Sequence, residues 1–207
     1  MRAGHKLFHM YENTASMDAD DCQAISMEFN APPLRLDARA MTPCRRNRFY
    51  WLNFQPAPLP IAQVGATLQA ALDVCSQAEA VFEKAYCIRS FGGYNYDGYG
   101  EEDALRNPGG MNPVRVRRGG VQFRDLDIEE KACCLGFPLG YMKNGQGTHS
   151  KRHKLIGQTF SVQVIRHLLE PLRQCFPSVA PSCIAACPPP SGLVEQLAQT
   201  TTNRRQI

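Results

Sequence analysis

The chain has 207 residues, of which 43% are hydrophobic, so it can form one or two domains with an apolar core. Its formal net charge is +4 and its pI is near 8.6, which permits a polyanionic partner without requiring one. Nine cysteines without a CxxC pair, no signal-like N-terminus and no run of membrane-spanning length argue against a zinc ribbon, a disulfide-stapled secreted domain and a membrane protein. We expect reduced thiols in a cytosolic or nuclear compartment.

The N-terminal part predicts a strand followed by a helix. Residues 7–11 are mostly apolar and predict a short buried strand, with Glu12 and Asn13 at its carboxyl end. Open α/β sheets bind ligands outside those ends, so a carboxylate there is well placed for chemistry. Residues 18–29 begin with acidic side chains and carry apolar ones at helical spacing, which predicts a helix that ends before Pro32.

Two further strands and a long helix are predicted next. Residues 34–38 alternate between apolar and polar side chains, and residues 48–54 are rich in aromatic side chains. Residues 61–83 are rich in Ala, Gln and Leu and predict a helix. Residues 89–120 contain eight of the sixteen glycines and predict a loop-dominated insertion. Residues 126–135 return to a helical pattern, which ends at a glycine.

The last elements complete a prediction of four regions. Residues 161–176 place Val, Ile and Leu on one helical stripe. Residues 1–60 are expected to hold the strands, 61–138 the glycine-rich insertion with a helix on either side, and 139–176 the final helix with the segment before it. Residues 177–207 contain little apolar material to bury and predict a flexible tail.

Basic residues gather in three short clusters, which could neutralise phosphates. Each cluster alone is explained equally well by a solvated loop. The clusters are Arg45, Arg46 and Arg48; Arg115, Arg117 and Arg118; and Lys151, Arg152 and Lys154.

Several motifs occur in a fixed order along the chain. They are Tyr11-Glu12-Asn13-Thr14, then residues 46–53 (an Arg-x-Arg followed by three aromatics), then residues 157–172, which begin Gly-Gln-Thr-Phe-Ser-Val. Together they resemble the C-terminal half of the catalytic domain of eukaryotic de novo DNA cytosine-5 methyltransferases. The resemblance covers roughly residues 7–176 and is thin across 91–125.

The resemblance implies a fold, a reaction and a cell compartment. The fold would be α/β, a partial Rossmann-like S-adenosylmethionine-dependent methyltransferase fold with a small loop-rich target-recognition region. That region would be residues 61–138, and residues 139–176 would be a closing segment with the final helix. The reaction would be methyl transfer from S-adenosyl-L-methionine to cytosine in duplex DNA, at CpG. The protein would then be nuclear and bind duplex DNA.

Three residues suit the chemistry of that reaction. Carbon 5 of cytosine becomes nucleophilic once a thiolate adds to carbon 6, and this addition needs a proton donor at ring N3. Glu12 suits the N3 role, and Arg46 and Arg48 suit the cationic donors that fix the base. The base must be flipped out of the duplex to reach them. A strand-end turn and an exposed strand edge are the ordinary alternatives for these motifs.

Other residues receive roles through the resemblance alone. The segment that closes over the cofactor maps onto Gln158, Thr159 and Phe160, where the family has Arg at the first position and Trp at the third. The loop that reads guanine maps onto Arg89, with Ser90 beside it. Residues 149–154 correspond to a segment used for DNA phosphates and a dimer contact. The DNA-binding residues implied there are Lys151 and Arg152.

The family's nucleophile and cofactor loop are expected before Glu12, and neither pattern is found there. Cys44 follows a proline but comes after Glu12, and the glycines of residues 91–94 open no predicted helix. His149 and His153 lie four apart without further nearby ligands, so no metal site is predicted. We therefore expect a truncated chain, inactive alone, whose first strand lacks neighbours.

Two alternatives stay open at the sequence level. The chain could be a non-catalytic accessory that binds DNA, or that forms a homo- or heterodimer with a complete methyltransferase chain. It could also be a truncated gene model, for which an upstream extension would supply the absent motifs.

Overall fold

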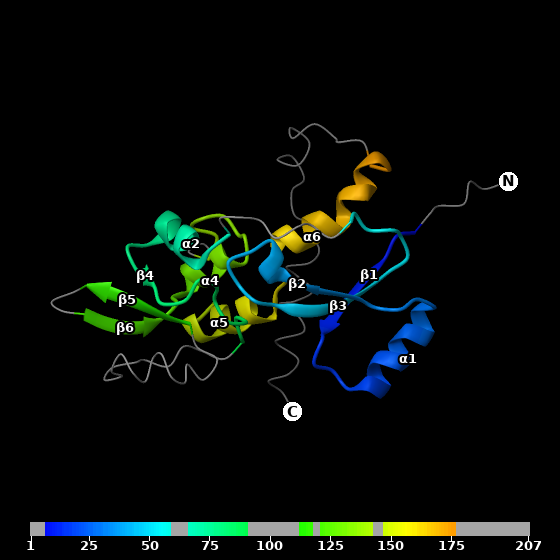
Figure 1. Ribbon diagram of the computed structural model, residues 1–207, viewed down its shortest axis with the longest axis horizontal. Helices are drawn as coiled ribbons and strands as arrows, with labels where there is room; N and C mark the ends of the chain where they lie inside the picture. The colour runs from blue at the N-terminus through cyan, green and yellow to red at the C-terminus, as the bar shows by residue number, and fades with distance from the viewer. Residues whose placement is uncertain (1–6, 59–65, 91–111, 118–120, 143–146, 177–207) are drawn as a thin grey trace, which may run out of the picture. The chain divides into compact units, whose positions relative to one another are not determined.

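The computed structural model describes residues 7–58, 66–90, 112–117, 121–142 and 147–176 (Figure 1). The chain divides into two compact units, Met1–Pro171 and Leu172–Ile207. The short 3-10 helix η2 (Glu170–Gln174) crosses this division, and the other elements described below belong to the first unit. The predicted tail, 177–207, lies outside the described residues. Within those ranges, no helix is long and apolar enough to cross a bilayer.

The first sheet has three antiparallel strands in the order β1-β3-β2. They are β1 (Met10–Thr14), β2 (Leu34–Asp37) and β3 (Asn47–Leu52). The prediction of a strand over 7–11 was wrong in its limits, because the backbone of Met10–Thr14 is what pairs with β3, while the side chain of Leu7 is 78% exposed. Glu12 consequently lies in the middle of a strand and not at its end.

Each face of this sheet is covered by one helix. One face presents Tyr11 and Trp51, which pack with each other, and Tyr11 also stacks on Phe29 of α1 (Ala19–Phe29). Trp51 is fully buried, and its indole N–H donates to Ser26 Oγ at 3.0 Å. On the other face, apolar side chains that alternate along the strands pack on α6 (Val162–Leu169). Its buried members are Leu36, Ala38, Met41, Tyr50, Val164 and Leu168.

The limits of α1 follow from its capping residues. The side chain of Asp18 accepts from the backbone N–H of Asp20 at the N-cap, and Asn30 adopts a left-handed conformation (φ 48°) at the C-cap. Both residue types favour those positions. The helix predicted over 18–29 is therefore confirmed.

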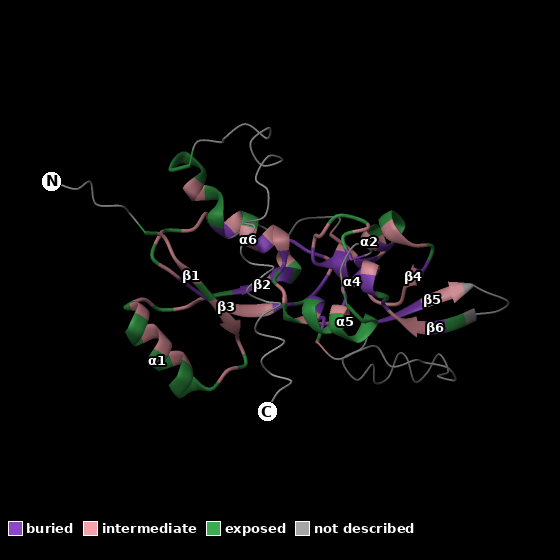
Figure 2. Cartoon of the chain, turned by 180° about the vertical axis from the view of Figure 1, so that it is seen from behind, coloured by how far each residue is buried: buried purple, intermediate pink, exposed green. Residues whose placement is uncertain are grey.

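A second core lies between another antiparallel sheet and three helices. The sheet has the order β4 (Glu79–Ala80), β5 (Pro113–Arg117) and β6 (Val121–Asp125). The helices are α2 (Leu68–Cys75), α4 (Ile128–Cys134) and α5 (His149–Gln158). Figure 2 shows buried residues concentrated at α4 and the strands beside it. The buried set includes Leu68, Leu72, Ile88, Val114, Leu126, Ala132, Leu135 and Ile156.

Three predicted elements have different limits in the structure. The helix predicted over 61–83 is only α2, because Thr67 caps its start and β4 follows four residues after its end. The loop predicted over 89–120 contains β5, whose Val114 is fully buried. The helix predicted over 161–176 is α helical to Leu169 and then tightens into η2, where Pro171 cannot donate a backbone hydrogen bond. The predicted helix over 126–135 is confirmed as α4.

The glycine expected to end that helix, Gly136, has φ +86°. Its N–H donates to Cys133 O, and the N–H of Phe137 donates to Ala132 O, which closes the last turn. A Cβ here would also fall within 2.4 Å of the Gln163 side chain. Glycine at 136 therefore serves both the turn and the packing of α6 on α4.

Charged side chains hold the junction of β6 and α4. Glu130 is fully buried and binds Arg124 through both carboxylate oxygens, at 2.6 and 2.7 Å. Glu130 and Asp127 also form a reciprocal capping box at the start of α4. Lys131 donates to Asp125 at 2.6 Å.

The predicted α/β class is confirmed, with helices packed on small sheets. Among the described residues, no strand pairs with the edge of β1 that faces away from β3. Such an edge exposes backbone groups that can pair with another chain.

Candidate functional site

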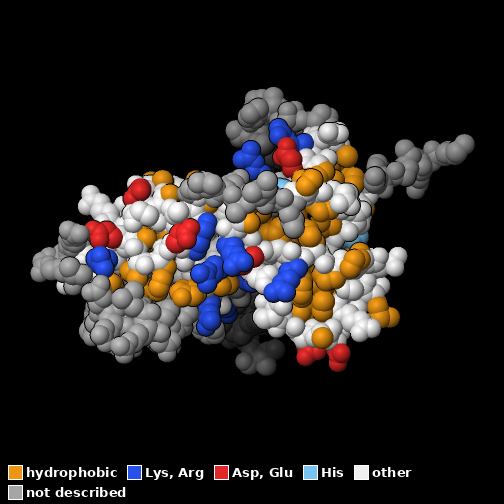
Figure 3. All heavy atoms as spheres, viewed as in Figure 1, with side chains coloured by type: hydrophobic (Ala, Val, Ile, Leu, Met, Phe, Trp, Pro, Cys, Tyr) orange, Lys and Arg blue, Asp and Glu red, His pale blue; other side chains and the backbone are white. Residues whose placement is uncertain are grey.

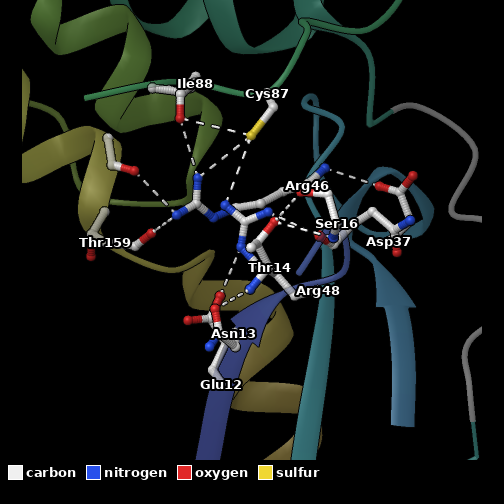
Figure 4. A network of polar contacts seen from close by, with 12 residues as sticks. Glu12, Asn13, Thr14, Ser16, Asp37, Arg46, Arg48, Cys87, Ile88 and Thr159 are labelled. Carbon is white, nitrogen blue, oxygen red and sulfur yellow. Dashed lines mark hydrogen bonds and ion pairs between the residues drawn. The ribbon is translucent and has the colours of Figure 1, made fainter. Parts of the chain in front are cut away.

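The register of the first sheet brings Glu12 and Arg48 together. Glu12 pairs with Tyr50, and Thr14 pairs with Arg48, so the side chains of Glu12 and Arg48 are diagonal neighbours on one face. Arg48 Nε lies 2.9 Å from Glu12 Oε1. This ion pair is half-buried and lies at the centre of Figure 4.

The ion pair does not give this oxygen a well-directed hydrogen bond. Glu12 Oε1 is buried and accepts no hydrogen bond of good geometry from the described residues, although Arg48 is close enough to attract it electrostatically. Arg48 turns its other N–H groups to Asn47 O at 2.9 Å and to Cys87 Sγ at 3.9 Å. Burial, and then the nearby charge of Arg48, lower the pKa of Arg46.

Arg46 holds three segments of the chain together. It is 4% exposed, and its guanidinium donates to Ile88 O at 3.2 Å, to Gly157 O at 3.3 Å and to Thr159 O (Figure 4). One of its N–H groups also points to Cys87 Sγ at 3.8 Å. These acceptors occupy the terminal nitrogens of Arg46. The geometry therefore favours a structural role, in which Arg46 holds these segments together, over a role as a hydrogen-bond donor to a base.

A parallel bridge explains why Arg46 meets this loop. Cys44 and Ala85 form an isolated parallel β-bridge, and the backbone of Arg45 donates to Ala85 O at 2.9 Å. Two residues further along each segment, Arg46 then comes beside Cys87. Contacts between residues 41 positions apart are therefore set by one backbone register.

Gly157 allows α5 to approach the same loop. A Cβ on Gly157 would lie 2.1 Å from Ser90 N and 2.2 Å from Arg89 C, which no side chain could tolerate without movement. The glycine of the Gly-Gln-Thr-Phe motif thus has a packing role. It brings the predicted guanine-reading loop against the predicted cofactor segment.

The predicted cofactor residues have different environments. The side chains of Gln158 and Phe160 are exposed, Phe160 by 45%, while Thr159 is half-buried with its carbonyl bound to Arg46. The amide of Gln158 and the ring of Phe160 suit one side of the nucleoside of S-adenosylmethionine. No residue of this segment carries a group that would pair with the sulfonium of that cofactor, so we derive no step through it.

The predicted DNA-binding residues are only partly free. Arg89 and Lys151 are exposed. Arg152 is half-buried and donates to Met142 O at 3.1 Å, so it also fixes the structure around α5. Figure 3 shows Lys and Arg side chains gathered on one face of the first unit, between the α4–α5 region and the first sheet.

The two motifs set aside in the sequence remain outside the site. Cys44 is completely buried in the second core, and burial raises the pKa of its thiol to about 11, which suits no nucleophile at neutral pH. The glycines at 91–94 lie outside the described residues. His149 and His153 bring their Nε2 atoms to 3.1 Å, but Lys131 Nζ lies 3.5 Å from the other nitrogen of His153. In the described ranges, no group of three metal-binding side chains occurs.

One residue of the site was missed by the sequence analysis. Cys87 lies between the guanidiniums of Arg46 and Arg48, at 3.8 and 3.9 Å. No local pattern distinguishes it from the other cysteines, because its environment depends on the bridge between Cys44 and Ala85.

Comparisons with known proteins give a distant likeness. No protein-family profile matches the chain. Among solved structures, the chain is similar to the crystal structure of S. pombe Dnmt2 methyltransferase, with 17% identity and a TM-score of 0.47. The alignment covers 80% of this chain and 67% of that chain. At this level of similarity the functional argument depends on the site itself.

Proposed function

We propose that this chain is the base-recognition part of a DNA cytosine-5 methyltransferase-type protein, acting in the nucleus on CpG in duplex DNA. Glu12 and Arg48 hold an extruded cytosine in this proposal, and Arg46 positions them. The single observation that carries it is the meeting of Glu12 with Arg48 beside Arg46, from two motifs more than thirty residues apart.

The chemistry of the pair suits a pyrimidine. A carboxylic acid can donate to ring N3, and a guanidinium can donate to the neighbouring carbonyl oxygen. Glu12 Oε1 lacks a well-directed donor among the described residues, so the carboxyl group retains capacity for a ligand. Arg89 and Lys151, both exposed, would contact a guanine and a phosphate respectively.

The cofactor of the proposed activity is S-adenosyl-L-methionine, which supplies a methyl group on a sulfonium. Gln158 and Phe160 would bind one side of it. Methyl transfer also needs a thiolate at carbon 6 of the base, and the buried Cys44 does not offer one.

The test is binding to a duplex in which the target cytosine of a CpG stands opposite an abasic site. Such a base is easily extruded, so a protein that binds flipped bases prefers this duplex to the matched one. We expect Glu12→Ala to reduce that preference about tenfold, which corresponds to about 1.4 kcal/mol. Glu28→Ala, on the exposed side of α1, is the matched control. Equal affinity of the unaltered protein for both duplexes would refute the proposal.

A second function, a non-catalytic accessory of a complete methyltransferase, is favoured by the edge of β1 that no described strand pairs with. A partner chain could add a strand there and complete the sheet. Transfer of labelled methyl groups to CpG DNA separates the two: turnover abolished by Glu12→Ala indicates an enzyme, whereas stimulation of an added family enzyme without turnover indicates an accessory.

A further inference from the structure

Cys87 has an unusual electrostatic environment. Its sulfur lies 3.8 Å from Arg46 Nη1 and 3.9 Å from Arg48 Nη2, and the residue is half-buried (Figure 4). Two guanidiniums in contact with one sulfur favour the negative charge that this sulfur carries while it attacks another sulfur. The partial exposure leaves a path for a small reagent.

The other well-packed thiols lack this combination. Burial raises the pKa of Cys44 to about 11 and that of Cys134 well above its ordinary value. Burial also raises the pKa of Cys75, to about 12, and that of its neighbour Cys133. Cys87, by contrast, has two guanidiniums within contact distance of its sulfur.

The surroundings of Cys87 also have unused hydrogen-bonding capacity. Arg46 is 4% exposed, and its Nε is a buried donor for which the described part of the chain offers no acceptor. Because the backbone carbonyls of Ile88, Gly157 and Thr159 fix its guanidinium, the positive charge stays beside the sulfur. A buried donor next to a half-buried thiol suits a ligand that brings an acceptor to this place.

We propose that Cys87 is a covalent modification site for small disulfides. The Cys87 thiolate attacks one sulfur of the disulfide and forms a mixed disulfide, while the old sulfur–sulfur bond breaks. The second half leaves as a thiolate and takes a proton from water. The disulfide itself is the oxidant, so no other reagent is needed.

This inference does not depend on the proposed DNA function. Its consequence for the site is nevertheless direct. The adduct adds volume beside Arg48, which is bound to Glu12, and it therefore competes with any ligand of that pair.

The test measures the rate at which each cysteine of the full chain reacts with 2-hydroxyethyl disulfide, by peptide mass spectrometry. The probe is neutral, so the basic surface does not concentrate it. Cys22 of α1 is the internal control, because it is also half-buried but follows Asp20 and Asp21. We expect Cys87 to react several-fold faster than Cys22 in the folded protein, and the two rates to converge in urea.

Two variants complete the test. Arg48→Gln should slow the reaction of Cys87 and leave that of Cys22 unchanged, whereas Arg48→Lys should restore most of the rate. Cys87→Ser should remove the adduct. A ratio of the two rates that is the same in urea and in native buffer overturns the proposal, as does an unchanged Cys87 rate in a folded Arg48→Gln protein. The first comparison needs no variant, so it holds even if a substitution prevents folding.

Discussion

Two buried charge networks in this chain are built in opposite ways. At the β6–α4 junction, the carboxylate of Glu130 binds Arg124 through both oxygens and also accepts the backbone N–H of Asp127. At the candidate site, Arg46 binds three backbone carbonyls and the sulfur of Cys87, and its Nε has no acceptor among the described residues. Glu12 Oε1 accepts no hydrogen bond of good geometry from those residues, although Arg48 Nε lies 2.9 Å away. Saturated networks stabilise a fold, whereas unsatisfied buried groups are frequent where a ligand binds.

The pKa of Glu130 reflects the saturated network. Burial alone would raise it, but the hydrogen bonds from Arg124 and from the backbone of Asp127 outweigh burial and hold it below its ordinary value. The group therefore stays ionised in the core of the molecule. We assign this junction to stability, and the Glu12–Arg48 region remains the proposed binding site.

The largest effect is expected at the saturated network. Glu130→Ala should lower the free energy of unfolding by about 3 kcal/mol, at the low end of the range for a broken buried pair, because Arg124 is 35% exposed and water can solvate it. Urea denaturation measures the loss. Glu28→Ala should change stability by less than about 0.5 kcal/mol. A small effect at Glu130 would remove the contrast between the networks.

The second prediction concerns the close contact at Gly157. Gly157→Ala should destabilise the protein by about 2 kcal/mol, because the new methyl group would overlap the backbone of Arg89 and Ser90. Thermal unfolding measures this, with the exposed Ser150→Ala on the same helix as control. Alanine favours helices, so a gain in stability would show that the loop moves away without cost.

The third prediction tests whether Arg46 stabilises the fold by holding backbone segments together. Lysine has the same charge but cannot reach several carbonyls at once, so Arg46→Lys should cost about 2 kcal/mol of unfolding free energy. The neighbouring Arg45 is exposed and lies over the ring of Tyr86, at 5.3 Å, which makes Arg45→Lys the matched control. Equal free energies of unfolding for the two variants in urea would contradict this structural role of Arg46.

The smallest effect is expected from acidification. Burial, and then the charge of Lys131, lower the pKa of His153 to about 4, so the unfolded chain binds this proton more readily than the folded one. The contribution of His153 to the free energy of unfolding is complete above pH 6.5 and is lost as the pH falls toward 4. Between pH 8 and pH 5.5 the loss amounts to about 1.4 kcal/mol. In His153→Gln, the free energy of unfolding should fall by about 1.4 kcal/mol less over this pH range. An unchanged dependence of stability on pH would contradict the role of His153.

Elements with strong local signals could be predicted from the sequence. Asp18 and Gly136 marked helix ends correctly, since capping depends on neighbouring residues. The limits of β1 were wrong because its apolar residues did not show which backbone groups would pair with β3. The strand β5 was hidden among glycines, although its alternating Val114 and Val116 were a usable signal.

The candidate site was predictable only in its motifs. Glu12 and Arg48 were selected correctly as near neighbours, but the acceptors of Arg46 lie 42 to 113 residues away in sequence. Neither hydrophobic period nor spacing encodes such contacts. The same holds for Cys87, whose environment arises from a single backbone bridge.

The chain has one tryptophan, Trp51, which is shielded from solvent and bonded to Ser26. Its fluorescence therefore reports on the first sheet alone, without interference from the core around α4. A red shift of the emission that precedes the loss of helical circular dichroism would show that the part around the first sheet unfolds separately from the core around α4. The fold thus contains its own optical probe for the part that holds Glu12.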